Sequence, residues 1–442
     1  MQPTSTVNRP PADLPERIGA ALETAAAEAL RELCNVAASE GLSLYLVGGA
    51  VRDHLLLDLA SSALPGLADI DLAVEGDPTP LHAALARLGD ASPTIHDRFG
   101  TASIHLAGGG RIDIARTRAE HYAAPGALPT VEPAPLLLDL KRRDFTVNAA
   151  AFALTGPDPG SLLDPYGAAA DARRRIIRTL HAQSFVDDPT RLIRCARYAA
   201  RLQARLSGKT ASEVRRERHY LSVLTPGRFA EAWRLLLTES DPASALRQAM
   251  SMQLPQSRST NWRVAPRVAR VADSPERFWA GVGLSEPSRE IVNRLPSVVA
   301  LQRREQRALI DGARLRSFRR RIGGTRRASS VASILATTDP NALEVAIGLW
   351  NGAAERAVSE YRRRNNAVRS PIAASRLIEL GVLPGPAIGA WLRWLTDAVW
   401  DRELDPNDPD AVARFEQRVA SEPEFPPRRR LTQARRPAGR GG

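Results

Sequence analysis

Two features near the start of the chain could carry out phosphate chemistry. An apolar run ends at Gly48 and Gly49, and a helix-like segment that contains Arg52 begins directly afterwards. Unpaired backbone amides and the helix dipole at such a turn favour a bound anion. Asp69 and Asp71 follow, and their spacing on a strand places both carboxylates on one face. Paired carboxylates beside an anion-binding turn suit metal-dependent phosphoryl transfer from a triphosphate.

The residues alone leave alternatives for these acids. An isolated pair of aspartates is more often a solvated turn than a metal site, and this pair gains weight only from the glycine turn before it. Asp113 lies between Ile112 and Ile114 on a strand-like segment. It is a candidate third carboxylate that supports the metal, and an ordinary surface acid is an equally good interpretation.

A third feature combines a helix start with a row of arginines. Asp188 and Pro189 are typical of an N-cap followed by the first helical residue. Arg191, Arg194 and Arg197 follow at steps of three and form one basic face, while apolar residues occupy the opposite face. A row of this kind is normally a solvated surface. Only its combination with the other motifs indicates a binding role.

Taken in order, these motifs resemble the family of CCA-adding tRNA nucleotidyltransferases and bacterial poly(A) polymerases, which belongs to the polymerase-beta-like nucleotidyltransferase superfamily. The matching segments cover roughly residues 40–235, about half of the chain. They are residues 46–53 with 69–71, 112–114, 121–129, 142–149, 164–167 with Asp171, and 187–191.

The resemblance implies an α+β fold, with a small mixed α/β head followed by an all-helical neck, body and tail. The hydrophobic pattern agrees, because short apolar runs separated by glycine give way to helical spacing. Helices are expected at 189–206, 227–238, 288–315 and 387–402. The predicted parts are a disordered leader (1–19), the head (20–158), the neck (159–250), the body and tail (251–424) and a disordered basic tail (425–442).

By resemblance, Asp69 and Asp71 would hold two Mg²⁺ ions, one at the attacking ribose hydroxyl and one at the leaving pyrophosphate. Gly48, Gly49 and Arg52 would contact the phosphates of the incoming nucleotide.

The second half of the site is also implied by the resemblance. Arg143 would meet the nucleotide and Asp144 its ribose region, while Arg194 and Arg197 would line the triphosphate path. Asp188 and Arg191 would select the base.

The proposed selection by Asp188 and Arg191 has a simple physical basis. A carboxylate acceptor matches the exocyclic amino group of cytosine or adenine, and a guanidinium donor matches the ring nitrogen. Uracil and guanine present a carbonyl and an N–H at these positions, so both contacts fail and buried polar groups stay unpaired.

Three functions are compatible with these motifs. The first is addition of CCA to the tRNA 3′ end from CTP and ATP. The second is that of a close relative: a poly(A) polymerase, or an enzyme that adds only A or only CC. The third is an inactive RNA-binding member, which the intact acidic and basic residues argue against. The segment 122–129 argues against a CC-only enzyme, since such enzymes resemble the family with this loop shortened.

Composition is consistent with an RNA partner. The formal net charge of +12 favours acidic partners such as tRNA. The two cysteines, Cys34 and Cys195, cannot form a disulfide framework and suggest a reducing cytoplasm. No apolar segment approaches signal or membrane length. We therefore expect a cytoplasmic protein with tRNA, CTP and ATP as partners, no membrane, and no implied protein partner.

Overall fold

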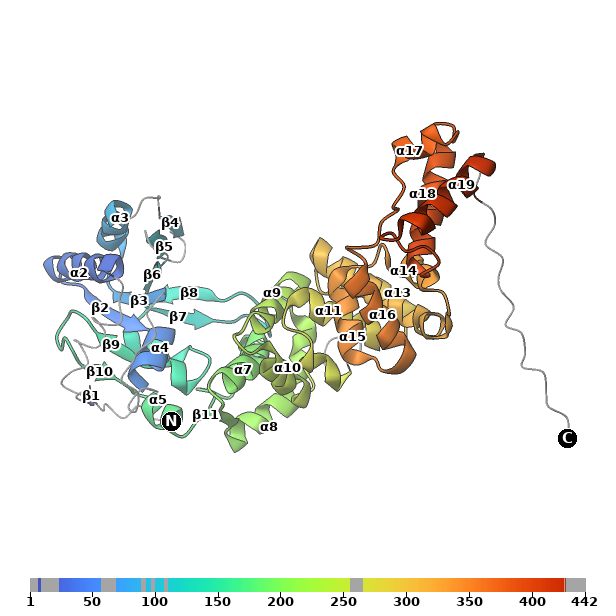
Figure 1. Cartoon of the computed structure of the whole chain (residues 1–442). Coiled ribbons are helices and arrows are strands. Elements are labelled where there is room, and N and C mark those ends of the chain that lie inside the picture. Colours follow the sequence, from blue (N-terminus) through green and yellow to red (C-terminus); the bar gives the residue numbers. More distant parts are fainter. Residues whose placement is uncertain are drawn as a thin grey trace. The chain divides into compact units, whose positions relative to one another are not determined.

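The computed structural model describes residues 7–8, 24–56, 69–88, 93–96, 100–106, 110–254, 265–424 and 426. Within these ranges, strands are confined to the first part of the chain and helices make up the remainder (Figure 1). The predicted α+β order is therefore confirmed. The contacts divide the chain into two compact units, residues 1–275 with 293–302 and residues 276–292 with 303–442. This division falls later than the predicted boundary between neck and body.

The two segments predicted to be disordered lie almost entirely outside the described residues. Within the leader, Val7–Asn8 is described as strand β1, which pairs antiparallel with β10 (Leu162–Leu163). These two residues therefore extend the sheet of the head.

In the described ranges, the head is built on one mixed sheet of eight strands, in the order β1-β10-β9-β2-β3-β6-β5-β4. Neighbouring strands are antiparallel except β3 and β6, which run parallel. The remaining strands are β2 (Ser43–Val47), β3 (Asp69–Glu75), β4 (Thr94–His96), β5 (Thr101–Leu106), β6 (Gly110–Arg116) and β9 (Ala151–Ala153).

The two faces of β3 have different environments because successive side chains point to opposite sides. Ile70, Leu72 and Val74 are buried on one face. On the other face, Ala73 belongs to a core cluster with residues of α4 (Leu136–Lys141), whereas Asp69 is exposed. One end of this face is therefore covered by apolar residues, and the other end is left open with its carboxylates.

The turn after β2 requires glycine for a steric reason. Gly48 has a φ of +73°, and a Cβ there would lie 2.7 Å from Oδ2 of Asp71. Val47 pairs with Asp71 in register, so the chain passes directly over that carboxylate. The expected helix after the turn is a π-helical segment, Val51–Leu56.

A hairpin and a group of helices complete the first unit. The hairpin consists of β7 (Arg118–His121) and β8 (Thr130–Pro133), and the short strands β11 (Ile176–Ile177) and β12 (Arg205–Leu206) pair in parallel. The helices are α2 (Thr24–Ser39), α3 (Thr79–Leu88), α5 (Ala168–Arg173), α6 (Ser184–Asp187), α7 (Thr190–Arg201), α8 (Gly208–Glu217), α9 (Pro226–Leu237) and α10 (Pro242–Ser251). The 3₁₀ segments Thr146–Asn148, Arg218–Val223 and Pro266–Arg270 connect them.

The rest of the described chain is helical. The elements are α11 (Pro275–Ser285), α12 (Arg289–Val298), α13 (Arg303–Gly324), α14 (Ala328–Leu335), α15 (Pro340–Leu349), α16 (Gly352–Arg364), α17 (Ala374–Glu379), α18 (Pro386–Trp400) and α19 (Pro409–Ser421). None of the described helices is both long and apolar enough to cross a bilayer.

One predicted helix, 288–315, is wrong as a single element. The chain breaks between α12 and α13, where Ala300 adopts a φ of +46°. A left-handed residue cannot continue a right-handed helix, so the pattern of apolar residues spans two helices. The helices expected at 189–206, 227–238 and 387–402 correspond to α7, α9 and α18.

In the second unit, the helices α11 and α13 pack against each other at two glycines, one on each helix. A Cβ on Gly312 would lie 2.3 Å from the carbonyl oxygen of Ala280, and a Cβ on Gly283 would lie 2.1 Å from that of Leu309. Neither approach is possible for a residue with a side chain, so the two backbones meet directly.

Gly312→Ala should therefore destabilise the second unit by about 1–3 kcal/mol, because the helices must separate to admit the methyl group. Urea unfolding followed by tryptophan fluorescence measures this change. The matched control is Gly324→Ala at the end of the same helix, where a Cβ meets nothing within 4 Å and helix propensity favours alanine. Equal effects of the two substitutions would contradict the proposed close contact.

Candidate active site

A cleft of about 950 Å³ opens in the first unit, beside the ends of β2 and β3. It brings together motifs that are far apart in the sequence. Asp113 is the one predicted site residue that does not line it. The predicted residues on its wall are Gly48, Gly49, Arg52, Asp69, Asp71, Arg143, Asp144, Asp188, Arg191, Arg194 and Arg197.

The acidic side of the cleft is formed by the parallel strands β3 and β6. Asp71 pairs in register with Asp113, and Asp69 with Arg111, so the three carboxylates share one face of the sheet. Asp113 accepts a hydrogen bond from Ser103 Oγ at Oδ1 and lies 2.7 Å from Arg111 Nη2 at Oδ2. Both of its oxygens are thus occupied by protein groups, and the acids that face the cleft are Asp69 and Asp71.

Charge at Asp71 is poorly compensated within the protein. Burial raises the pKa of its carboxyl group, and the negative charge of Asp113 raises it further. Asp69 and Asp71 offer carboxylate oxygens, and both groups are negative when ionised. Such a pair fits a hard divalent cation. In the described part of the chain, no three His, Cys, Asp or Glu side chains converge as a metal-ligand cluster. Asp69 and Asp71 are therefore the two carboxylates of the cleft that could hold such a cation.

Arg52 is held rigidly despite its charge. Its side chain is 3% exposed, and its Nε and Nη2 each donate to an oxygen of Asp53 at 2.6 Å. Nη1 donates to Oδ1 of Asn148 at 2.9 Å, and the guanidinium carbon lies 5.0 Å from the centre of the Tyr198 ring. This geometry fixes the guanidinium at the mouth of the glycine turn, with no rotamer freedom to lose on binding an anion.

Arg143 shares a buried carboxylate with its neighbour. Asp139 accepts from Arg143 Nη2 at 3.1 Å and from Arg142 Nε and Nη2 at 2.9 and 2.6 Å. Burial alone would raise the pKa of Asp139, but the two guanidinium groups lower it overall. Asp139 therefore stays ionised and orients Arg143 toward the cleft.

Asp144 connects the head to α7. It is 3% exposed, and its Oδ1 accepts from the Phe145 backbone N–H and from Asn148 Nδ2, both at 2.8 Å. Its Oδ2 lies 2.7 Å from Nη2 of Arg194. Burial alone would raise the pKa of Asp144, but Arg194 is the strongest of the groups that lower it below its usual value. This geometry makes Asp144 a positioning group for Arg194, and Asp144 also lines the cleft.

The sequence predicts Asp188 to be the N-cap of α7, but it lies one residue before the N-cap of the structure. The helix begins at Thr190 with Pro189 as N-cap, yet the carboxylate still satisfies the helix start. Oδ1 accepts from Thr190 N at 3.1 Å, from Thr190 Oγ1 at 2.7 Å and from Arg228 Nη2 at 2.9 Å. All three donors contact one oxygen, and in the described ranges no protein donor contacts Oδ2.

Arg191 is buried and oriented by groups from two elements. Nη1 donates to Ser184 Oγ at 2.9 Å, and Nη2 donates to the carbonyl oxygen of Arg142 at 2.7 Å. Nη1 also lies 3.4 Å from Nε2 of His181. Burial and the charge of Arg191 lower the pKa of His181 to about 4. The imidazole is therefore neutral at physiological pH and can accept a hydrogen bond from Arg191.

Arg197 is fixed by a residue that the motifs did not indicate. Glu239 accepts from Arg197 Nε at 2.9 Å and from Arg201 Nε and Nη2 at 2.8 and 2.7 Å. Burial alone would raise the pKa of Glu239, but hydrogen bonds from Arg201 and Arg197 lower it overall. The same two arginines lie over the ring of Tyr198, which also lines the cleft.

Arg228 is a second residue that sequence analysis missed. It follows the helix start at Thr225 and Pro226, and the sequence gives no sign that it reaches Asp188 some 40 residues earlier. Tyr198 was missed for a different reason. It lies four residues after Arg194 and seven after Arg191, so it shares the basic face of α7, but in the sequence only the row of arginines indicates that face.

Comparison with known proteins agrees with this geometry. Residues 44–178 match the model of the poly A polymerase head domain. The A-adding tRNA nucleotidyltransferase of Halalkalibacterium halodurans is 38% identical over 220 residues, which are 49% of this chain and 50% of that protein. The CC-adding tRNA nucleotidyltransferase of Deinococcus radiodurans is 39% identical over 204 residues, which are 46% of this chain and 52% of that protein. The chain thus spans about half the length of these two relatives.

Solved structures extend the similarity over nearly the whole chain. A CCA-adding enzyme in an apo form is 25% identical, with a TM-score of 0.75 over 92% of this chain and 98% of that chain. The Thermotoga maritima CCA-adding enzyme complexed with tRNA is 24% identical, with a TM-score of 0.74 over 93% of this chain and 98% of that chain, and it supports the fold alone.

Glu239→Gln should lower the free energy of unfolding at pH 7 by about 1–3 kcal/mol, because it removes the charged acceptor of two arginines. The folded-state pKa of Glu239 is lowered, so its contribution is present at neutral pH and is lost as the pH falls through that pKa. Unfolding measured at pH 7 and below about pH 4 tests this. The control is Glu231→Gln on α9, which pairs with Arg234 at 3.5 Å and is 65% exposed. An equal loss for both variants, or a loss that persists in acid, would contradict the assignment.

Proposed function

Because the chain belongs to the family of CCA-adding tRNA nucleotidyltransferases and bacterial poly(A) polymerases, we propose that it adds CCA to the 3′ end of tRNA, using CTP and ATP and releasing pyrophosphate. The observation that carries this proposal is one cleft that holds both a base-selecting pair, Asp188 and Arg191, and a pair of carboxylates, Asp69 and Asp71. Base selection and phosphoryl transfer require both pairs together.

Asp188 and Arg191 have the properties that base selection needs. Each is held in place by protein hydrogen bonds but keeps hydrogen-bonding groups for a base. Oδ2 of Asp188 has no protein donor among the described residues. The guanidinium of Arg191 has five N–H donors, more than its protein contacts use. A base with an exocyclic amino group and a ring acceptor fits this pair. Because Arg191 is buried, a wrong base would leave polar groups unpaired, which costs about 1–3 kcal/mol.

The arginines of the cleft provide the binding site for the triphosphate. Arg52, Arg143, Arg194 and Arg197 each contact a protein carboxylate that orients them. Preorganised guanidinium groups stabilise charge as it develops on a transferring phosphoryl group, without reorganisation at the moment of reaction. They also exclude water from the phosphates by filling the wall of the cleft.

Magnesium would be held by Asp69 and Asp71, with Asp113 supporting them through its charge on the neighbouring strand. When bound, divalent ions supply Lewis-acid stabilisation of the reacting phosphate and the leaving pyrophosphate. The protein residues position the ions and the triphosphate relative to each other. The absence of a side chain at Gly48 avoids a clash with Oδ2 of Asp71.

Two alternatives within the family are an A-adding or poly(A)-forming enzyme and a CC-adding enzyme. The β7–β8 loop, residues 122–129, is retained in this chain, and by family resemblance this favours an enzyme that completes CCA over one that stops after CC. An inactive RNA-binding member is less consistent with the structure, because the acidic and basic groups of the cleft are complete and oriented.

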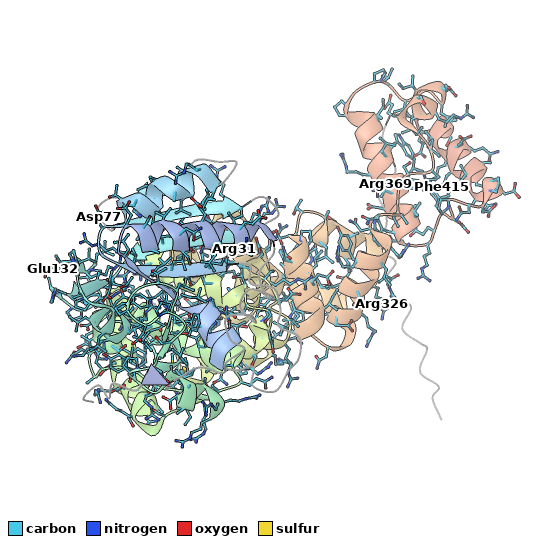
Figure 2. All side chains as sticks on the ribbon, turned by 90° about the vertical axis from the view of Figure 1, so that its left-hand side faces the viewer. Arg31, Asp77, Glu132, Arg326, Arg369 and Phe415 are labelled. Carbon is cyan, nitrogen blue, oxygen red and sulfur yellow. The ribbon has the colours of Figure 1, made fainter. Side chains whose placement is uncertain are left out.

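The acceptor tRNA would be bound mainly through arginine-rich surfaces, by phosphate contact and shape rather than by sequence. In the second unit, α13 carries exposed arginines, and Figure 2 shows Arg326 and Arg369 on the surface of the same unit. The exposed arginines of α13 are Arg303, Arg304, Arg307, Arg314, Arg319, Arg320 and Arg321. We place the reaction in the cytoplasm, in keeping with two cysteines that are both unpaired.

A tRNA transcript that ends before CCA should gain two residues with CTP alone, none with ATP alone and three with both nucleotides, because one site must select C before A. Denaturing gels resolve these products. Addition of A alone to this transcript would favour a poly(A) polymerase. Addition of A only to a transcript that already ends in CC would indicate an A-adding enzyme, and arrest after CC with both nucleotides would indicate a CC-adding one.

Asp71→Asn should reduce nucleotide incorporation by at least about a hundredfold, because it removes a charge that the reacting phosphate and its cations require. The affinity for tRNA should change by less than about twofold, since phosphate contacts elsewhere carry it. Single-turnover kinetics and filter binding measure the two quantities. Asp158→Asn, an exposed residue outside the cleft, is the control. Normal turnover of the Asp71 variant would remove the basis for the active-site assignment.

A further inference from the structure

The tip of the β7–β8 loop (residues 122–129) is docked on the helices that follow the head (Figure 1). The Gly126 N–H donates to the carbonyl oxygen of Val186 at 3.0 Å. Gly126 has a φ of +69°, and a Cβ there would lie 2.7 Å from Val223 Cγ2 and 3.5 Å from Pro189 Cδ. The docked position therefore depends on glycine at this point of the loop.

Arg228 connects this docked tip to the base-selecting carboxylate. Its Nη1 donates to the carbonyl oxygen of Gly126, and its Nη2 donates to Oδ1 of Asp188 at 2.9 Å. Because the guanidinium is planar and rigid, the angle between these two hydrogen bonds is fixed. Arg228 is the third residue of α9, and the Thr225 hydroxyl accepts a hydrogen bond from its backbone N–H, so its backbone is anchored at the helix start.

We propose that Arg228 is a positioning residue that couples docking of the β7–β8 loop to the orientation of Asp188, and through it to the choice of base. The effect on base choice rests on the proposed function. The coupling between Arg228 and the loop does not. Arg228 does not contact the nucleotide in this scheme. It acts through Asp188.

The geometry of Asp188 explains why one arginine matters. Its other two donors, the backbone N–H and hydroxyl of Thr190, belong to a residue two positions away. They hold Oδ1 near the start of α7, whereas Arg228 is the donor that approaches from another helix. Without it, the carboxylate can rotate about its contacts to Thr190, and the direction of Oδ2 toward a base is lost. Undocking of the loop removes the acceptor on Gly126 and leaves Arg228 free to move in the same way.

A purely structural role for Arg228 makes a different prediction. If the side chain only stabilised the start of α9, its removal would lower stability without changing which nucleotide is bound. The two roles are therefore separated by a measurement of selectivity together with a measurement of loop docking.

The experiment compares Arg228→Ala, Arg228→Lys and Gly126→Ala in the full chain. Hydrogen exchange of the backbone amides in residues 123–128 reports docking, and the ratio of CTP to UTP affinity, measured by equilibrium binding, reports base choice. We expect Arg228→Ala to speed exchange and to reduce the affinity ratio, each by about tenfold. Arg228→Lys should recover part of the ratio, because an ammonium group can serve one acceptor at a time.

Gly126→Ala disturbs the same contact from the loop side, since its Cβ would meet Val223. It should reproduce both effects, and combining it with Arg228→Ala should add little to either variant alone. The control is Arg234→Ala on the same helix, whose side chain donates to Glu231 and to the carbonyl oxygen of Ala300. It should leave loop exchange and the affinity ratio unchanged.

Unchanged exchange in Arg228→Ala would overturn the coupling, and so would faster exchange with an unchanged ratio. An additive double variant would also overturn it, because the two residues would then act independently. Failure of the proposed function is distinguishable: the unmodified protein would then show no preference for CTP over UTP, and the inference about base choice would fall with it. The exchange data would in that case still decide whether Arg228 holds the loop.

Discussion

The buried carboxylate of Asp144 is the interaction on which the cleft depends. A buried charge is unfavourable unless it is paired and hydrogen-bonded, and this one is satisfied by groups from both sides of the cleft: Arg194 on α7, and Asn148 and a backbone amide of the head. Asn148 also accepts from Arg52. Arg52 after the glycine turn, the segment 142–149 and helix α7 are thus joined through one carboxylate. Loss of its charge would release groups on both walls at once.

The same principle recurs around the site. The arginines that face the cleft contact protein carboxylates or carbonyl oxygens, some of them shared, so the positive wall is assembled within the protein itself. The acidic strands differ, because burial and then the negative charge of Asp113 raise the pKa of Asp71. The protein thus orients its cleft arginines by internal contacts, whereas Asp71 keeps a raised pKa. This asymmetry separates the acidic end of the cleft from its basic wall.

The sequence was sufficient to predict the α+β order, and all the predicted site residues except Asp113 line the cleft, because each belongs to a local motif with a strand, turn or helix start of its own. It was insufficient wherever a partner comes from a distant element. Glu239 and Arg228 act through contacts made some 40 residues away in the chain, and no periodicity signals such a pairing. The helix expected at 288–315 failed because a single residue, Ala300, leaves the right-handed region while the apolar spacing continues across the break.

The parallel pairing of β3 and β6 also determines when the site can form during synthesis. Asp71 and Asp113 meet only through a crossover connection, which includes α3 and the intervening strands, and parallel pairs with such connections form slowly. The arginines of α7 emerge later still from the ribosome. In a nascent chain the acidic strands are therefore present once β6 has been made, whereas the basic wall is missing until α7 has been made. The order of translation itself would therefore delay assembly of the complete cleft until α7 has joined the acidic strands.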